Sequence, residues 1–211
     1  MDTMLIDLHT IIKTAPSKIR GVIHIGAHYG QEYADYLRAG IENMMFFEPV
    51  KSTYEKLLEV VVTTDKVRAY NLALGNYTGK AEIFIEKANN GQSCSLLEPG
   101  THLDSYPHIK FDHPKEEIGI TTLDNIEFDM SQFNMLNIDI QGYELEALKG
   151  AVETLPFIDI IYTEINVGPV YKNCCVVGDL DAFLAAYGFE RVLTHMAHKT
   201  WGDALYLKKQ K

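Results

Sequence analysis

The sequence has few cysteines, few basic residues and no long apolar run. Its three cysteines, Cys94, Cys174 and Cys175, are odd in number and two are adjacent, which excludes a disulfide framework and the spaced ligands of a zinc site. Only 19 Lys and Arg residues stand against 29 Asp and Glu residues, so the net charge is −10. Nucleic-acid-binding proteins usually carry a basic surface, and the only basic run here is a tail at residues 208–211. A nucleic acid partner is therefore not expected.

No segment approaches the ~20 apolar residues of a membrane-spanning helix. The N-terminus contains early acids and no basic segment ahead of an apolar one, so it does not have the pattern of a secretory signal. Residues 1–20 instead predict an amphipathic helix with Leu5, Leu8, Ile11 and Ile12 on one face. These features predict a cytoplasmic protein with reduced thiols and no membrane partner.

Strand-like and helix-like segments alternate along the chain, whose 211 residues fit one α/β domain. The expected strands cover residues 21–26, 43–49, 67–74, 80–86, 117–124, 135–140, 157–165, 189–195 and 203–209. The expected helices cover residues 31–40, 52–61 and 144–150, with a last one that begins at Asp179 or Asp181 and ends at Tyr187. Ser52 and Glu55 have the spacing of a capping box for the second helix. The alternation predicts a doubly wound, mostly parallel sheet, and the last two strands are close enough for an antiparallel hairpin.

A glycine turn follows the first expected strand. Gly26 allows a sharp turn and close approach of a ligand to the backbone. With Ala27, His28 and Gly30 it forms only part of the glycine fingerprint of dinucleotide-binding proteins. Glu48 ends the next strand about twenty residues later, where an acid can accept hydrogen bonds from both ribose hydroxyls. The turn and the acid together predict a nucleoside site, with either S-adenosylmethionine or NAD as its cofactor.

Glu32 distinguishes the two cofactors. It lies close to the start of the helix that follows the glycine turn, so its charge would repel the pyrophosphate of NAD. The same charge would attract the amino group and the sulfonium of S-adenosylmethionine. The sequence therefore favours the methyl donor, with an NAD-dependent oxidoreductase as the alternative.

Two acids lie at the ends of neighbouring expected strands, at the reacting end of the fold. Asp139 ends LNID and Glu164 ends IYTE, so both are expected to face the crevice outside the carboxyl ends of the strands. Methyl transfer to a sugar hydroxyl needs a general base or a metal ion, because the hydroxyl has a high pKa. Asp139 and Glu164 are the candidates for both roles, with Mg²⁺ or Mn²⁺ as the possible metal.

The block LNIDIQGYELEALKGA at residues 136–151 resembles the hallmark of the FkbM family of methyltransferases. GITTLDNI, IYTEIN, FFEP and WGDALYLK match this family in order and spacing, and the resemblance covers about Gly21 to Leu207. It implies a class I methyltransferase, Rossmann-like fold and O-methylation with S-adenosylmethionine, often on sugars or glycan ends. By position, Pro49, Ala73, Ser93 and Ile140 would join the glycine turn, Glu32 and Glu48 around the cofactor.

The chain departs from the family pattern at two positions. His24 stands where many members have Asp, and Asn137 stands where Lys is common. These departures leave a non-catalytic binding module as a further alternative. The irregular residues 87–115 are interpreted as the acceptor-binding loop, in which Tyr106 and His108 are candidates for stacking on a sugar.

Overall fold

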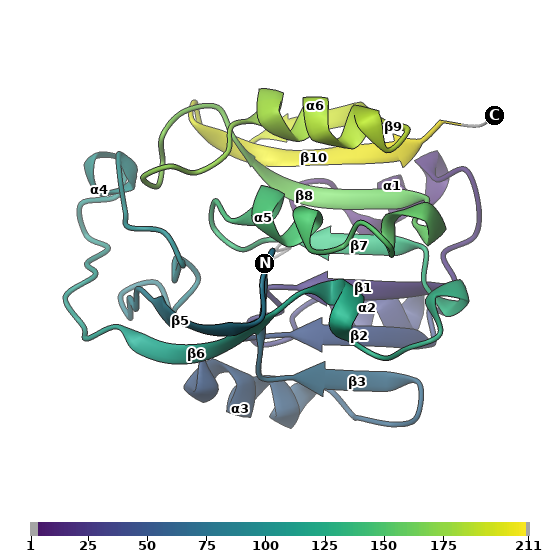
Figure 1. Ribbon diagram of the computed structural model, residues 1–211, viewed down its shortest axis with the longest axis horizontal. Coiled ribbons are helices and arrows are strands. Elements are labelled where there is room, and N and C mark those ends of the chain that lie inside the picture. The colour runs from purple at the N-terminus through teal and green to yellow at the C-terminus, as the bar shows by residue number, and fades with distance from the viewer. Residues whose placement is uncertain (1–3, 210–211) are drawn as a thin grey trace.

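A computed structural model describes residues 4–209, which fold around a seven-stranded sheet (Figure 1). The strands lie in the order β3-β2-β1-β7-β8-β10-β9. Their bounds are β1 (Gly21–Ile25), β2 (Asn43–Phe47), β3 (Val67–Tyr70), β7 (Met135–Ile138), β8 (Ile160–Asn166), β9 (Phe189–Met196) and β10 (Trp201–Lys208). β1, β2, β3, β7 and β8 are parallel, whereas β9 and β10 form an antiparallel hairpin. The predicted doubly wound sheet with an antiparallel C-terminal hairpin is confirmed.

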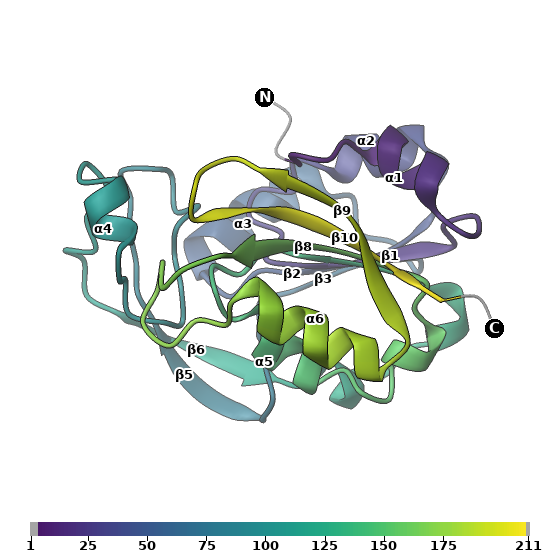
Figure 2. The same ribbon diagram turned by 90° about the horizontal axis from the view of Figure 1, so that it is seen from above.

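Helices cover both faces of this sheet (Figure 2). On one face α1 (Leu8–Thr14), α2 (Tyr33–Arg38) and α3 (Lys51–Val60) bury Ile11, Tyr36 and Leu57 against the strands. On the other face α5 (Glu144–Lys149) and α6 (Val177–Ala186) bury Leu148 and Leu180. The sheet is thus the middle of three layers, and the order of its strands reverses between β1 and β7.

A second, three-stranded sheet lies beside the carboxyl ends of the main strands. It contains β4 (Ala73–Leu74), β6 (Glu116–Thr121) and β5 (Gly79–Ile83), in that order. The prediction of one strand over residues 67–74 is wrong, because β3 and β4 belong to different sheets. Between them, the Asn71 amide donates to the backbone oxygens of Glu48 and Pro49, which turns the chain away from the main sheet.

The segment at residues 87–115 is irregular as expected, apart from α4 (His102–Ser105). Short 3-10 helices occupy Leu123–Asn125, Met130–Gln132 and Leu155–Phe157. Among residues 4–209, no helix combines the length and apolar character needed to cross a membrane. Part of the predicted N-terminal helix (residues 1–3) and part of the basic tail (residues 210 and 211) lie outside the described residues.

The predicted starts of two helices need correction. α3 begins at Lys51 after Val50, so Ser52 lies inside the first turn and makes no capping box with Glu55. α6 begins at Val177, earlier than expected, and the Asp179 carboxylate accepts a hydrogen bond from the Val176 amide.

The N-terminal helix is shorter than predicted. Asp7 caps α1 by accepting a hydrogen bond from the Thr10 amide, and Leu8 and Ile11 are buried. Ile12 is 41% exposed, so it does not belong to the buried face. Leu5 precedes the helix and lines a cavity instead.

Candidate active site

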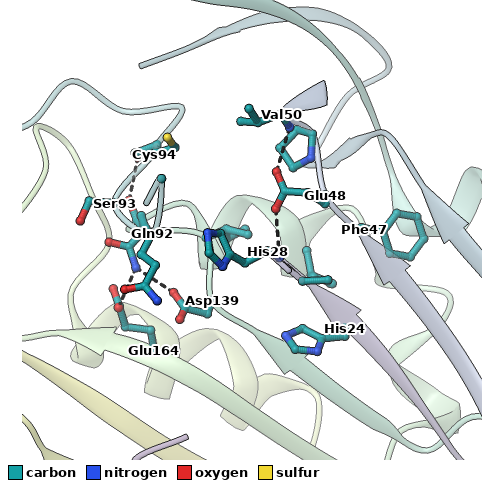
Figure 3. Close-up of a pocket in the computed structure, with 18 of the residues that line it drawn as sticks. His24, His28, Phe47, Glu48, Val50, Gln92, Ser93, Cys94, Asp139 and Glu164 are labelled. Atoms are coloured by element: carbon teal, nitrogen blue, oxygen red, sulfur yellow. Dashed lines mark hydrogen bonds between the residues drawn. The ribbon is translucent and has the colours of Figure 1, made fainter. Parts of the chain in front are cut away.

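A cavity of about 530 Å³ opens at the carboxyl ends of β1, β2, β7 and β8 (Figure 3). This is the edge of the sheet where the strand order reverses, which is where open α/β sheets bind ligands. Its volume falls within the range of small-molecule and cofactor sites, roughly 300–1,000 Å³. The wall is completed by residues 89–96, by residues around His102 and by β10.

The glycine turn after β1 forms one side of the cavity. Gly26 has a φ of +84°, and a Cβ atom there would lie 1.9 Å from the backbone oxygen of Asp139. Only glycine allows the loops after β1 and β7 to approach so closely. Ala27 and His28 line the cavity, whereas Gly30 does not. A Cβ atom at Gly30 would meet the Leu57 side chain of α3 at 2.7 Å, so packing explains this glycine.

Glu48 lies at the end of β2, as predicted, and only 6% of its surface is exposed. Its carboxylate accepts hydrogen bonds from the Val50 amide at 2.8 Å and the His28 amide at 3.1 Å. Burial raises the pKa of Glu48 to about 7, and the two backbone hydrogen bonds oppose this rise. Each carboxylate oxygen can still accept a second hydrogen bond, so the group remains able to bind a diol.

The wall beside Glu48 is largely apolar. The cluster that contains Val50, Ala73 and Ile83 contributes to it, and Cys94 and Leu96 pack against the same cluster. The other residues assigned to the cofactor from the sequence, Glu32, Pro49, Ser93 and Ile140, also line the cavity. The base of a nucleoside can therefore lie against this apolar wall while its ribose lies next to Glu48.

Asp139 and Glu164 lie together at the far side of the cavity (Figure 3). The Gln141 amide nitrogen donates to Asp139 Oδ1 at 2.8 Å and to Glu164 Oε2 at 3.0 Å. The Tyr171 hydroxyl donates to Gln141 Oε1 at 2.8 Å, which fixes the orientation of the amide. Gln141 and Gly142 have φ values of +57° and +98°, so a tight turn after β7 positions this bridge.

Two further acids lie beside this pair. Glu144, at the start of α5, is fully buried and accepts hydrogen bonds from the Ile140 and Gly142 amides. Asp203 pairs with Glu164 in the register of β10 and β8, and it accepts hydrogen bonds from the Tyr162 hydroxyl and the Leu5 amide. A cluster of four carboxyl groups therefore lies at this side of the cavity, and three of them, Asp139, Glu164 and Asp203, line it.

The surroundings of this cluster raise the pKa values of its carboxyl groups toward or above neutral pH. Asp139 is accessible from the cavity, but the protein encloses it, and this desolvation together with the charge of Asp203 raises its pKa to about 7. Desolvation and the charges of Asp139 and Glu144 raise the pKa of Glu164 well above its usual value. Groups that titrate near neutral pH are suited to accept or release protons during catalysis.

The charge of the cavity wall is strongly one-sided. Five acids line the cavity, and the lining contributed by residues 4–209 includes no Lys or Arg. These acids are Glu32, Glu48, Asp139, Glu164 and Asp203. Such a wall repels phosphate groups and attracts cations. The cavity is thus matched to a cationic nucleoside and not to a dinucleotide pyrophosphate.

Comparison with known proteins agrees with this geometry. The sequence profile described as the methyltransferase FkbM domain matches residues 24–191. The chain belongs to the FkbM methyltransferase family. It is 25% identical over 162 residues to the 2-O-methyltransferase NoeI of Sinorhizobium fredii (strain NBRC 101917 / NGR234), and the alignment covers 72% of this chain. The chain spans 65% of the length of that relative.

Solved structures share the fold of this FkbM methyltransferase at low sequence identity. A putative S-adenosylmethionine-dependent methyltransferase from Listeria monocytogenes aligns with a TM-score of 0.57 and 8% identity, over 96% of this chain and 97% of that one. A putative tRNA (m1A22) methyltransferase from Streptococcus pneumoniae, solved with S-adenosyl-L-methionine, aligns with a TM-score of 0.52 and 13% identity. The alignment covers 97% of this chain and 72% of that one. The fold of the present chain is therefore that of the Rossmann-like S-adenosylmethionine-dependent methyltransferases.

The donor set of the FkbM site does not fit a catalytic metal ion. No group of three or more His, Cys, Asp and Glu side chains among residues 4–209 could hold one. The space between Asp139 and Glu164 also contains the Gln141 amide nitrogen, which is a donor and not a ligand.

Several residues of the FkbM site were not found from the sequence. Gln141 and Tyr162 donate hydrogen bonds to members of the carboxylate cluster, and Asp203 is one of its members. The register of β8 with β10, which places Asp203 opposite Glu164, cannot be read from the sequence. Among the histidines of residues 87–115 and of the hairpin, His102 and His108 line the cavity, whereas His113, His195 and His198 do not.

Proposed function

We propose that this protein transfers the methyl group of S-adenosylmethionine to a hydroxyl group of a sugar or glycan. One observation carries the proposal: a single cavity joins a buried acid at the end of β2 to the Asp139 and Glu164 pair, and its lining within residues 4–209 includes no Lys or Arg. Membership of the FkbM family supports methyl transfer, and the relative named a 2-O-methyltransferase supports oxygen as the acceptor atom.

The cavity residues fit the methyl donor in three respects. Glu48 is placed to accept hydrogen bonds from the ribose hydroxyls, and the apolar wall with Val50 and Ala73 suits the adenine ring. The acidic lining complements the positive charge of the donor. When bound, the donor supplies an activated methyl group on a sulfonium.

Asp139 is the proposed general base. Its Oδ1 atom is held by Gln141, which leaves Oδ2 for the acceptor hydroxyl. A hydroxyl that loses its proton to Asp139 as the new carbon–oxygen bond forms becomes a much better nucleophile. Glu164, tied to the same Gln141 amide, would orient the acceptor by accepting a hydrogen bond from a neighbouring hydroxyl.

The acceptor itself would lie against residues 87–115. Tyr106 and His108 from this loop line the cavity together with Trp201 of β10. The Trp201 indole N–H donates to the Tyr106 hydroxyl at 2.9 Å, which fixes both rings. Large aromatic side chains with polar edges offer an apolar face and hydrogen-bonding groups to one ligand, as a sugar ring requires.

The direct test mixes the protein with methyl-labelled S-adenosylmethionine and a panel of monosaccharides, glycosides and oligosaccharides. Mass spectrometry then reports labelled products. We expect methyl transfer to a subset of the sugars and binding of S-adenosylhomocysteine by calorimetry. Binding of NADH without binding of either adenosyl compound would overturn the proposal. Binding of a glycan without transfer, over the whole panel, would favour a non-catalytic module.

Matched variants test the assigned residues. Asp139→Asn and Glu164→Gln are expected to lose transfer while they still bind S-adenosylhomocysteine. Glu98→Gln serves as the control, because Glu98 is exposed and its carboxylate pairs with Lys172 on the surface. A normal rate in Asp139→Asn would show that another group accepts the proton.

A further inference from the structure

His24 occupies a special place under the cavity. It lies near the end of β1, only 3% of its surface is exposed, and it lines the cavity (Figure 3). It pairs in register with Asn137 on the neighbouring strand β7, and its Nδ1 atom lies 4.0 Å from Glu32. A polar ring in so buried a place needs hydrogen-bond partners.

A chain of hydrogen bonds links His24 to the strand beside it. The Asn137 amide donates to the Tyr36 hydroxyl at 2.7 Å. We assign the hydrogen of that hydroxyl to the contact with His24 Nδ1, at 3.3 Å. Burial lowers the pKa of His24, so the ring is neutral and has one hydrogen to place. With Nδ1 as the acceptor, the hydrogen lies on Nε2.

His24 Nε2 has no hydrogen-bond partner in the part of the chain that the structure describes. Two other kinds of anion donor, basic side chains and the amides that begin the glycine turn, do not serve at this side of the cavity. Lys and Arg are absent from the lining contributed by residues 4–209. The amides of Gly26 and Ala27 both donate to the Phe47 backbone oxygen, and the His28 amide donates to Glu48.

We infer that the Nε2–H group of His24 donates a hydrogen bond to the carboxylate at the amino-acid end of the methyl donor. This inference rests on the proposed function, since it assumes an adenosyl amino acid in the cavity. His24 therefore binds the methyl donor and takes no part in proton transfer. Tyr36 and Asn137 act as positioning residues, because they hold the ring in the tautomer that binding requires.

The test compares two ligands that differ only in this carboxylate. S-adenosylhomocysteine and its decarboxylated analogue are titrated by calorimetry into the wild type, His24→Phe and His24→Gln. Because a hydrogen bond to a charged group contributes to affinity, loss of the carboxylate is expected to weaken binding to the wild type about 10- to 100-fold. In His24→Phe, which keeps an aromatic ring beside Phe46, the two ligands are expected to bind within about twofold of each other.

His24→Gln is expected to restore part of the preference, because its amide can donate. His9→Phe is the matched control, since His9 is exposed on α1 and lies outside the cavity. It should keep the full preference of the wild type. The ratio of two affinities within one variant cancels any uniform effect of the substitution on the pocket, and melting temperatures confirm that each variant is folded.

A measurement on the wild type needs no substitution. Long-range ¹⁵N–¹H correlation spectra distinguish the two neutral tautomers of histidine, and we expect the Nε2–H form of His24. An Nδ1–H form, or an unchanged ligand preference in His24→Phe, would overturn the inference. If the wild type binds neither S-adenosylmethionine nor S-adenosylhomocysteine, the proposed function fails instead, so the two failures are distinguishable.

Discussion

The fully buried Glu144 allows a quantitative test of how charge in this site affects stability. Its Oε1 atom accepts hydrogen bonds from the Ile140 amide at 3.2 Å and from the Gly142 amide at 2.9 Å. Burial raises its pKa from 4.5 to about 7. Glutamine can accept both hydrogen bonds with its single oxygen and carries no charge. Glu144→Gln should therefore remove the cost of ionisation and keep the turn.

The sign and size of the effect follow from proton linkage. A group with a raised pKa binds more protons in the folded than in the unfolded state, so its contribution to stability falls as the pH rises from about 4.5 through about 7. One pKa unit corresponds to about 1.4 kcal/mol. Between pH 5 and pH 8, the wild type is expected to lose about 2–3 kcal/mol relative to Glu144→Gln. Placing the amide near Cys175 can change the free energy of unfolding by an amount that does not depend on pH, and this amount cancels when the two pH values are compared.

Urea unfolding of both proteins at pH 5, 6, 7 and 8 measures the difference in the free energy of unfolding. We expect the difference to grow in favour of the variant from pH 5 to pH 7 and to level off toward pH 8. Glu98→Gln should show no such trend, because Glu98 is an exposed surface residue. A difference that stays constant with pH, or that grows in favour of the wild type, would refute the reasoning.

Three further predictions concern the same cavity. Asp139→Asn should lower kcat/KM about 100-fold or more and abolish its rise with pH near 7, which a pH–rate profile measures, because only the ionised carboxylate accepts a proton. Gly40→Ala should lower the free energy of unfolding by about 1–2 kcal/mol. Gly26→Ala should lower it further and abolish binding of S-adenosylhomocysteine. Both glycines have positive φ, but only at Gly26 would Cβ meet a backbone oxygen at 1.9 Å; equal effects in urea unfolding and calorimetry would contradict this. A chelator should leave methyl transfer unchanged, because Gln141 Nε2 lies between the two carboxylates; loss restored by Mg²⁺ would contradict it.

The main sheet was predictable because most of its strands are local apolar segments with clear turn residues at their ends. The small sheet was not, since β4 has two residues and continues the strand-like pattern of β3. Its separation depends on Asn71, whose amide binds the backbone after β2. A side-chain contact of this kind leaves no periodic signal in the sequence.

The site was predictable where it depends on strand ends. Glu48 and Asp139 follow apolar strands, Glu164 lies near the end of another, and the structure brings all three to one cavity. Asp203 and the tautomer of His24 were not predictable. The first depends on the register of the hairpin, and the second depends on a hydroxyl that α2 delivers from the helical layer.

The position of β10 has a consequence for how the molecule is made. β10 follows β9 in the chain, yet it lies between β8 and β9 in the sheet. While the ribosome is still adding residues 201–208, β8 has an open edge and β9 has no neighbour to pair with. The glycine turn and Glu48 can therefore take shape early in synthesis, whereas Asp203 reaches Glu164 only with the last strand. A nascent chain must meanwhile keep the apolar edge of β8 from pairing with another chain.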